Sequence, residues 1–281
     1  MVLTERDTRL LLKLQSYAIL TTRQMAWMVF PGVAITTVLR RLRALERNGY
    51  IQRIEGLPST ERAWGISTKS AAMHPDQVSK VHFPKHSLDH DLKLTALRLL
   101  LEREKLALSW IPEHEIRTKI ARAHGLREAQ RKVIPDGIVG VKTKGVKESI
   151  SIELELNFKN SRRYSQIFHD YRRKTNLYAV WYVVGSESIG RHLAKCFRQC
   201  YFTARQPYLF WSVLQDVMHD PFAATLWHEN KEYFVSQIFE KKTNEPAHPP
   251  AQEVSRVNND SITENSNSTA EYNSEKLALA K

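Results

Sequence analysis

Three carboxylates and a lysine stand at spacings that suit chemistry on a phosphodiester. Asp136 lies in the segment VIPDGIVGV, and Glu153 and Glu155 lie in SISIELELNF. Both segments have the pattern of a β-strand, and period-two alternation puts Glu153 and Glu155 on one face, roughly 7 Å apart. Adjacent strands that present carboxylates to one point can hold a hard divalent cation, Mg²⁺ or Mn²⁺, through oxygen ligands.

Pro135-Asp136 followed by Glu153-Leu154-Glu155 resembles the PD-(D/E)xK nuclease motif, with Glu155 in place of the usual lysine. Lys159 is the nearest basic substitute, and its long side chain can reach back past the strand end. The alternative is that these are solvated carboxylates on the open face of a half-buried sheet. The resemblance implies catalytic roles for Asp136, Glu153, Glu155 and Lys159, and metal ligands at Asp136 and Glu153, with Glu113 as an outer ligand.

The chain has 281 residues and a formal net charge of +12, which is unevenly spread. Residues 243–281 include six acidic and three basic residues, so the rest of the chain carries +15. A body this basic attracts polyanions, of which nucleic acid is the commonest large one. The alternative is a basic soluble protein without such a partner. Segment 243–281 is also rich in Asn, Ser, Glu and Pro, which predicts a disordered tail.

Cysteine usage and hydropathy indicate the cytoplasm. Cys196 and Cys200 are four residues apart in a helical pattern, which predicts packed thiols and no disulfide framework. The N-terminus lacks the apolar segment of a signal peptide. The longest apolar run, around LYAVWYVV, is too short for a membrane span and predicts a buried strand. We therefore expect a cytoplasmic protein with no membrane span.

The N-terminal third has the pattern of a winged helix-turn-helix. Leu3, Leu10, Leu11 and Leu14 predict a first helix, and Thr21 with Gln24 forms a capping box that begins a second. A third helix is expected from about Thr36 to Asn48, followed by strands at Tyr50–Ile54 and Ala63–Ile66.

The third helix of such a domain lies in the major groove, where arginines reach guanine edges or phosphates, and the wing contacts the backbone. The alternatives are a solvated arginine-rich face and a dimerisation or protein-docking module. The expected DNA-binding residues are Arg40, Arg41, Arg43 and Arg47 on the helix, and Arg53 and Arg62 at the wing.

The middle of the chain predicts an α/β (α+β) domain. A helix at about Ser87 to Lys105, with an inner stripe of Leu92, Ala96, Leu99 and Leu100, precedes a strand around Leu108–Arg117. The Asp136 and Glu153 strands follow, then the basic helix SRRYSQIFHDYRRKT and the buried strand LYAVWYVVGS. A helix at Arg191–Phe202 and a strand near Tyr208–Leu214 come last. This αβββαβ order is that of the restriction-endonuclease-like fold.

A winged helix in tandem with this domain is similar to the plasmid replication-relaxation family and the related MobC-type mobilization relaxases. The similarity covers roughly residues 4–215 and rests on the order of short motifs. These are His90-Asp91-Leu92 opening the long helix, Trp110 with Glu113 on the first strand, Pro135-Asp136, Glu153-Leu154-Glu155, and the basic helix ending near Tyr171. For His90 we expect a capping or ligand-supporting role.

We therefore expect a winged helix over 1–80, a nuclease-like domain over 83–240 and a tail over 243–281. The implied function is a protein that binds double-stranded DNA at a plasmid origin-like site and nicks it with Mg²⁺ or Mn²⁺. Other mobilization or conjugation proteins are possible partners. Two alternatives stay open: a non-enzymatic replication or transfer regulator with a degenerate nuclease fold, favoured by the missing lysine, and a defence endonuclease.

Overall fold

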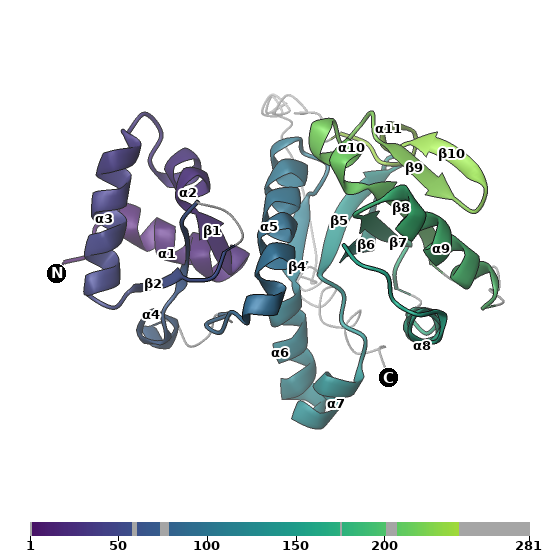
Figure 1. Ribbon diagram of the computed structural model, residues 1–281, viewed down its shortest axis with the longest axis horizontal. Coiled ribbons are helices and arrows are strands. Elements are labelled where there is room, and N and C mark those ends of the chain that lie inside the picture. Colours follow the sequence, from purple (N-terminus) through teal and green to yellow (C-terminus); the bar gives the residue numbers. More distant parts are fainter. Residues whose placement is uncertain (1, 58–60, 74–78, 175, 201–206, 242–281) are drawn as a thin grey trace, which may run out of the picture. The chain divides into compact units, whose positions relative to one another are not determined.

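A computed structural model describes residues 2–57, 61–73, 79–174, 176–200 and 207–241 (Figure 1). These residues belong to one compact unit, Met1–Lys242. The expected disordered tail, 243–281, lies outside the described residues. No helix in the described part of the chain is long and apolar enough to cross a membrane.

The N-terminal part has the winged helix topology that the sequence predicts. Thr4 and Thr21 each begin a helix with a reciprocal capping box, the second one with Gln24 as expected. The three short strands form an antiparallel sheet in the order β1-β3-β2. The elements are α1 (Glu5–Tyr17), β1 (Ile19–Thr21), α2 (Thr22–Val29), α3 (Ile35–Arg47), β2 (Ile51–Ile54) and β3 (Ala63–Ile66).

Leucines at helical spacing form much of the hydrophobic core of the winged helix. Leu10 and Leu14 of α1 are fully buried against Leu42 and Leu45 of α3 and against Trp64. The Trp64 indole donates a hydrogen bond to the Thr22 hydroxyl, 3.0 Å away. The apolar face of α3 therefore points inward, and its arginine-rich side is left on the outside.

The second part is built on a sheet that, in the described residues, has the order β10-β9-β8-β7-β6-β5-β4. Strands β4, β5 and β6 are antiparallel neighbours, and β6, β7 and β8 are parallel. The αβββαβ order is present as α5, β4, β5, β6, α8 and β7. Their bounds are α5 (Leu88–Arg103), β4 (Ser109–Pro112), β5 (Gly137–Thr143), β6 (Val146–Glu155), α8 (Ser161–Tyr171), β7 (Ala179–Val184), α9 (Glu187–Arg198) and β8 (Tyr208–Val213).

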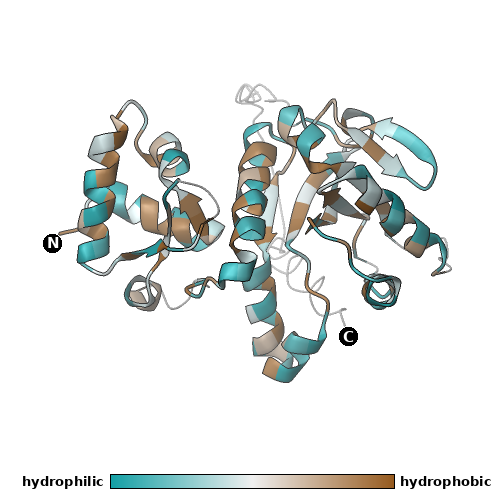
Figure 2. Ribbon diagram, viewed as in Figure 1, coloured by the Kyte–Doolittle hydropathy of each residue, from teal (hydrophilic) through white to brown (hydrophobic). Residues whose placement is uncertain are grey.

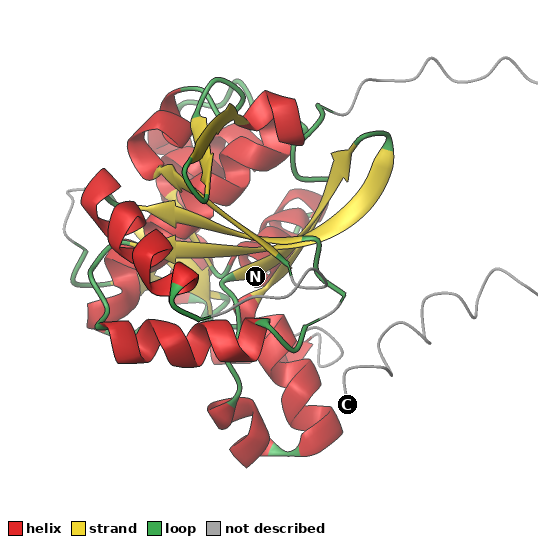
Figure 3. Cartoon of the chain, turned by 90° about the vertical axis from the view of Figure 1, so that its right-hand side faces the viewer, coloured by secondary structure: helices red, strands yellow, loops and turns green. Residues whose placement is uncertain are grey.

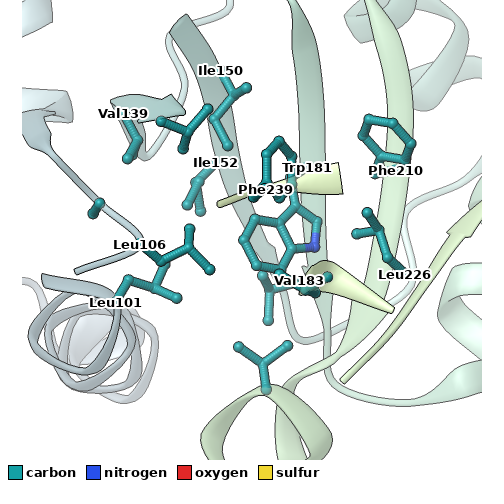
Figure 4. Packing of buried hydrophobic residues seen from close by; sticks show 14 of the residues in the cluster. Leu101, Leu106, Val139, Ile150, Ile152, Trp181, Val183, Phe210, Leu226 and Phe239 are labelled. Atoms are coloured by element: carbon teal, nitrogen blue, oxygen red, sulfur yellow. The ribbon is translucent and has the colours of Figure 1, made fainter. Parts of the chain in front are cut away.

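Helices lie on both faces of this sheet (Figure 3). On one face, Leu97 and Leu101 of α5 pack against Val139, Ile150 and other strand residues (Figure 4). On the other face, α8 and α9 cover residues such as Tyr182 and Trp211. The hydrophobic colour accordingly concentrates on the central strands in Figure 2. Alternate side chains of β6 thus face different layers, which places Glu153 and Glu155 on the α8 side.

The segment after β4 differs from the expectation. The predicted strand Leu108–Arg117 ends at Pro112, and Glu113 begins a helix, α6 (Glu113–His124), which α7 (Leu126–Arg131) follows. Pro112 caps this helix in an extended conformation, and Glu113 and Glu115 suit its positive N-terminal end. Glu113 is therefore a helix residue and not a strand residue.

The buried stripe of α5 also differs from the expectation. Of the expected residues only Leu100 is buried, whereas Leu97 and Leu101 are fully enclosed. The reason is that α5 packs on two sides: Leu97 contacts the large sheet, while Leu99 packs against the winged helix core. A helix with two partners has no single apolar stripe.

Short elements without strong periodicity complete the described chain. The sequence pattern does not predict these elements, and α9 begins and ends four residues earlier than the expected helix at Arg191–Phe202. They are α4 (Thr68–Met73), the 3₁₀ turn η1 (Lys85–Ser87), α10 (Leu214–His219), β9 (Thr225–His228), β10 (Lys231–Phe234) and α11 (Val235–Ile238). Cys196 is buried and Cys200 half-buried, both as free thiols.

Candidate functional site

The pairing of β5 with β6 brings the predicted carboxylates together. Gly137 of β5 stands opposite Ile152 of β6, so Asp136, one residue earlier, comes alongside Glu153. Glu153 in turn stands opposite Tyr182 of β7. Glu155 follows two residues later on the same face of β6. Sequence reasoning predicted this convergence, and the register of the sheet produces it.

Asp136 is held by groups from two elements. Its Oδ2 accepts a hydrogen bond from the Leu154 backbone N–H at 2.7 Å and lies 3.2 Å from the His90 Nε2. The same His90 nitrogen lies 3.1 Å from the Leu154 carbonyl oxygen. Because both neighbours are acceptors, Nε2 carries the proton and donates. These contacts use one carboxylate oxygen of Asp136, and no described residue hydrogen-bonds to the other.

The two neighbouring carboxylates favour the charged form of His90. Burial lowers the pKa of His90, but hydrogen bonds and charge interactions with Asp136 and Asp91 outweigh burial and raise it to about 10. Burial acts against the charge of Asp91 as well, yet His90 and Lys80 hold the Asp91 pKa below its usual value. Lys80 reaches Asp91 at 2.7 Å. The His90-Asp91 pair therefore supports Asp136, which is the role expected for His90.

Of the three acids, Glu153 has the least compensation for its negative charge. Burial, and then the charge of Asp136, raise the Glu153 pKa to about 8. The Tyr171 hydroxyl of α8 donates to one Glu153 oxygen. Beside Glu153, the buried hydroxyl of Tyr182 has no hydrogen-bond partner among the described residues, whereas the Ser151 hydroxyl lies close to Tyr171. A carboxylate next to a second carboxylate and an unpartnered hydroxyl is a setting that a bound cation would stabilise.

Glu155 and Lys159 form an ion pair across the end of β6. The Lys159 ammonium contacts the Glu155 carboxylate, whose side chain is 7 % exposed. Burial raises the Glu155 pKa, and the Lys159 contact opposes that rise. Lys159 lies beyond the strand and reaches back to it, as the sequence analysis anticipated.

Lys174 is a site residue that sequence reasoning missed. It follows α8, and burial lowers its pKa, while the charge of Glu153 opposes that effect. Its ammonium donates to the Val133 carbonyl at 2.9 Å and lies 4.4 Å from the Tyr171 ring centre. The run Arg172-Arg173-Lys174 gives no sign of which basic residue turns inward, so only the fold could identify it.

Glu113 lies near Asp136 but belongs to another element. Its backbone N–H donates to the Asp136 carbonyl at 3.2 Å, while its side chain pairs with Arg117 one turn along α6. Glu113, Asp91 and Asp136 line one small cavity with a volume of about 40 Å³. The position suits an outer role, and the Arg117 pair occupies the carboxylate.

The donor chemistry of the site fits a divalent cation, although the residues are not arranged as a ready ligand set. Across the described ranges, no group of three or more His, Cys, Asp or Glu side chains is placed to hold a metal. The fit rests instead on the raised pKa of Glu153 beside Asp136 and on the unpartnered Tyr182 hydroxyl opposite it. Asp136 and Glu153 would hold the cation through carboxylate oxygens.

The expected DNA-binding arginines of α3 divide into two groups. Arg40, Arg43 and Arg47 are exposed and share one side of the helix, and none has an ion-pair partner in the described residues. Arg41 is different because it grips the buried Asp7 of α1 through two nitrogens, with Nε to Oδ1 at 2.8 Å. Arg41 therefore ties α3 to α1.

Neither of the two wing arginines pairs with a buried acid in the described residues, unlike Arg41. Arg53 on β2 is exposed and pairs with Glu55 at 3.0 Å. Arg62, just before β3, is half-exposed, and its carbonyl accepts hydrogen bonds from the Thr22 backbone and hydroxyl. Residues 58–60 of the wing lie outside the described residues.

Comparisons with known proteins find little. No family model matches the chain, and no curated protein matches it. Among solved structures, a match is found to the restriction endonuclease FokI at 10% identity and a TM-score of 0.25. It covers 75% of this chain and 41% of the endonuclease, so the chain spans less than half of that protein. At this level of similarity the match does not identify the function.

Proposed function

We propose that the chain is a DNA-binding protein that nicks DNA in the manner of a plasmid mobilization relaxase, using Mg²⁺ or Mn²⁺. The observation that carries the proposal is the convergence of Asp136, directly before β5, with Glu153 on the adjacent strand β6, with Glu155 and Lys159 beside them. The family resemblance of the motif order supports the finer assignment. The winged helix, with its unpaired arginines on α3, would bind the duplex.

Each residue has a distinct task in this proposal. A bound cation would lower the pKa of a water and stabilise charge on the phosphorus. Asp136 and Glu153 would hold it, and His90 with the Leu154 N–H fixes the Asp136 carboxylate. Lys159 would stabilise the negative charge that develops on the phosphate, with Glu155 orienting its ammonium.

The test is scission of a supercoiled plasmid that carries the cognate site, with Mg²⁺, with Mn²⁺ and with EDTA. We expect open circles with metal and intact supercoils with EDTA. Asp136→Ala should abolish scission, a loss of at least about 100-fold as for removal of an essential stabilising group, while site binding persists. Scission that continues in EDTA and in Asp136→Ala would rule out this site, and linear product would indicate a double-strand endonuclease.

A second candidate is a non-enzymatic binder with a degenerate nuclease fold. The observation in its favour is that every acid already has a protein partner: His90 for Asp136, Tyr171 for Glu153 and Lys159 for Glu155. This candidate predicts intact supercoils in both metals, together with retained DNA binding.

A further inference from the structure

Helix α8 has two faces with different surroundings. Its inner residues Tyr164, Ile167, Phe168 and Tyr171 are buried, and the Tyr171 hydroxyl contacts Glu153. Its outer side carries exposed Arg162, Arg163, Gln166 and His169, with Arg172 and Arg173 in the following turn. One face therefore reaches the carboxylates while the other presents positive charge to solvent.

The arginines of the outer side lack internal neutralisation. Among the described residues, none of Arg162, Arg163, Arg172 and Arg173 has an ion-pair partner, whereas Arg98, Arg117 and Arg191 all do. The one acid of the helix, Asp170, accepts a hydrogen bond from the Val133 N–H at 3.3 Å. The two arginine pairs stand roughly 15 Å apart along the helix axis. Such spacing fits an extended polyanion more readily than a single small anion.

An exposed aromatic side chain stands at the head of this helix. Phe158 is 60% exposed in the loop between β6 and α8, next to Lys159. Its ring packs edge-on against His192 of α9, with ring centres 5.6 Å apart. An open phenyl ring beside a basic surface is a combination by which proteins hold unpaired bases, since every base has a face that stacks. A base inside a duplex offers no such face.

We propose that the outer side of α8 together with Phe158 binds a single DNA strand, with the arginines on phosphates and Phe158 stacked on a base. This surface is separate from α3 of the winged helix, and strand binding there does not depend on whether the carboxylate site cuts. A strand on α8 would pass Lys159 and so reach the end of β6 where Glu155 lies.

The experiment measures fluorescence anisotropy of a labelled single-stranded oligonucleotide in EDTA, over a salt series. The protein carries Arg40→Ala, Arg43→Ala and Arg47→Ala, so that the winged helix surface is disabled. Adding Arg162→Gln, Arg163→Gln and Arg173→Gln should weaken binding at least about 10-fold. It should also lower the salt slope by roughly 2, because each lost phosphate contact on a single strand removes roughly 0.7.

A charge-matched control is available on α6 and α7. Arg122→Gln, Arg127→Gln and Arg131→Gln remove the same charge from other exposed positions and should change affinity less than 3-fold. Phe158→Ala should weaken binding about 5-fold or more at an unchanged salt slope, and Phe158→Tyr should restore it. The altered side chains are exposed, so melting temperatures should stay within a few degrees.

Two results would overturn the proposal. An equal loss in the matched control would mean that net charge alone drives binding. An equal loss of duplex and single-strand affinity in the α8 variant would make the surface a duplex contact. Neither result bears on plasmid scission, and absence of scission in every metal leaves the strand-binding prediction in force, so the two proposals fail separately.

Discussion

Glu153 is the residue at which burial, a neighbouring carboxylate and a tyrosine act on one group. Its ordinary pKa of 4.5 rises to about 8 in the folded protein. Between these values the folded chain holds a proton that the unfolded chain has lost. The free energy of unfolding of the metal-free protein should therefore fall as pH rises from about 4.5 to about 8, by at most about 1.4 kcal/mol per pH unit.

His90 adds a second pH range over which the free energy of unfolding falls as pH rises, because its pKa rises from 6.5 to about 10. Its contribution to stability is complete below pH 6.5 and is lost as pH rises through about 10. Glu153→Gln should remove the pH dependence of stability that Glu153 causes and leave the dependence that His90 causes at higher pH. Urea unfolding in EDTA at intervals from pH 5 to pH 9 measures both, and equal slopes in wild type and variant would contradict the assignment.

Glu155 and Lys159 permit a charge-swap test at the same scale. Glu155→Lys places two ammonium groups together at a buried position and should destabilise the protein by about 2–4 kcal/mol. Adding Lys159→Glu restores an opposite pair and should recover most of that loss. The swapped protein also carries lysine at the usual motif position. If this double variant still nicks DNA, scission needs an opposite-charge pair at positions 155 and 159 but does not need the acid to be at 155.

At the scale of elements, α3 carries both exposed arginines and an arginine that pairs with a buried acid, within four residues. Arg40→Ala with Arg43→Ala should cost about 1–3 kcal/mol per base-contacting arginine and flatten sequence preference, since both are exposed and unpaired. Gel-shift titration at fixed salt measures this loss. Unchanged affinity and preference would show that α3 does not read DNA.

Arg41→Ala is the matched control on the same helix. It removes the partner of the buried Asp7 and should lower the free energy of unfolding by about 1–3 kcal/mol. Because Arg41 is committed to α1, its loss should alter DNA preference much less than the loss of Arg40 and Arg43. We therefore expect Arg40→Ala with Arg43→Ala to weaken DNA binding with little change in stability, and Arg41→Ala to lower stability with little change in DNA preference.

At the scale of the whole molecule, Arg98 of α5 links the winged helix to the large sheet. It donates to the Ser16 carbonyl at 2.6 Å, pairs with Glu102 at 2.8 Å and stacks 4.0 Å from the Tyr17 ring centre. The Tyr17 hydroxyl also donates to Glu102. These contacts join residues about 80 positions apart within the unit Met1–Lys242.

Arg98→Met should therefore lower the free energy of unfolding by about 2–4 kcal/mol and make unfolding less cooperative, because the two parts lose their shared polar cluster. Arg103→Met on the same helix removes an exposed pair with Glu104 and should cost less than about 0.5 kcal/mol. Calorimetry measures both, and a single sharp transition in Arg98→Met at the wild-type temperature would contradict the role.

The sequence by itself determined the winged helix, the αβββαβ order and the convergence of Asp136 with Glu153, because local periodicity, capping boxes and strand alternation carry that information. It did not determine that Glu113 begins a helix, that Arg41 turns inward, or that Lys174 lies near Glu153. These depend on which partner a side chain meets, and residues far apart in the chain supply the partner. The predicted buried residues of α5 were wrong for the same reason. The helix packs against two neighbours, so its buried residues do not lie on the single face that periodicity describes.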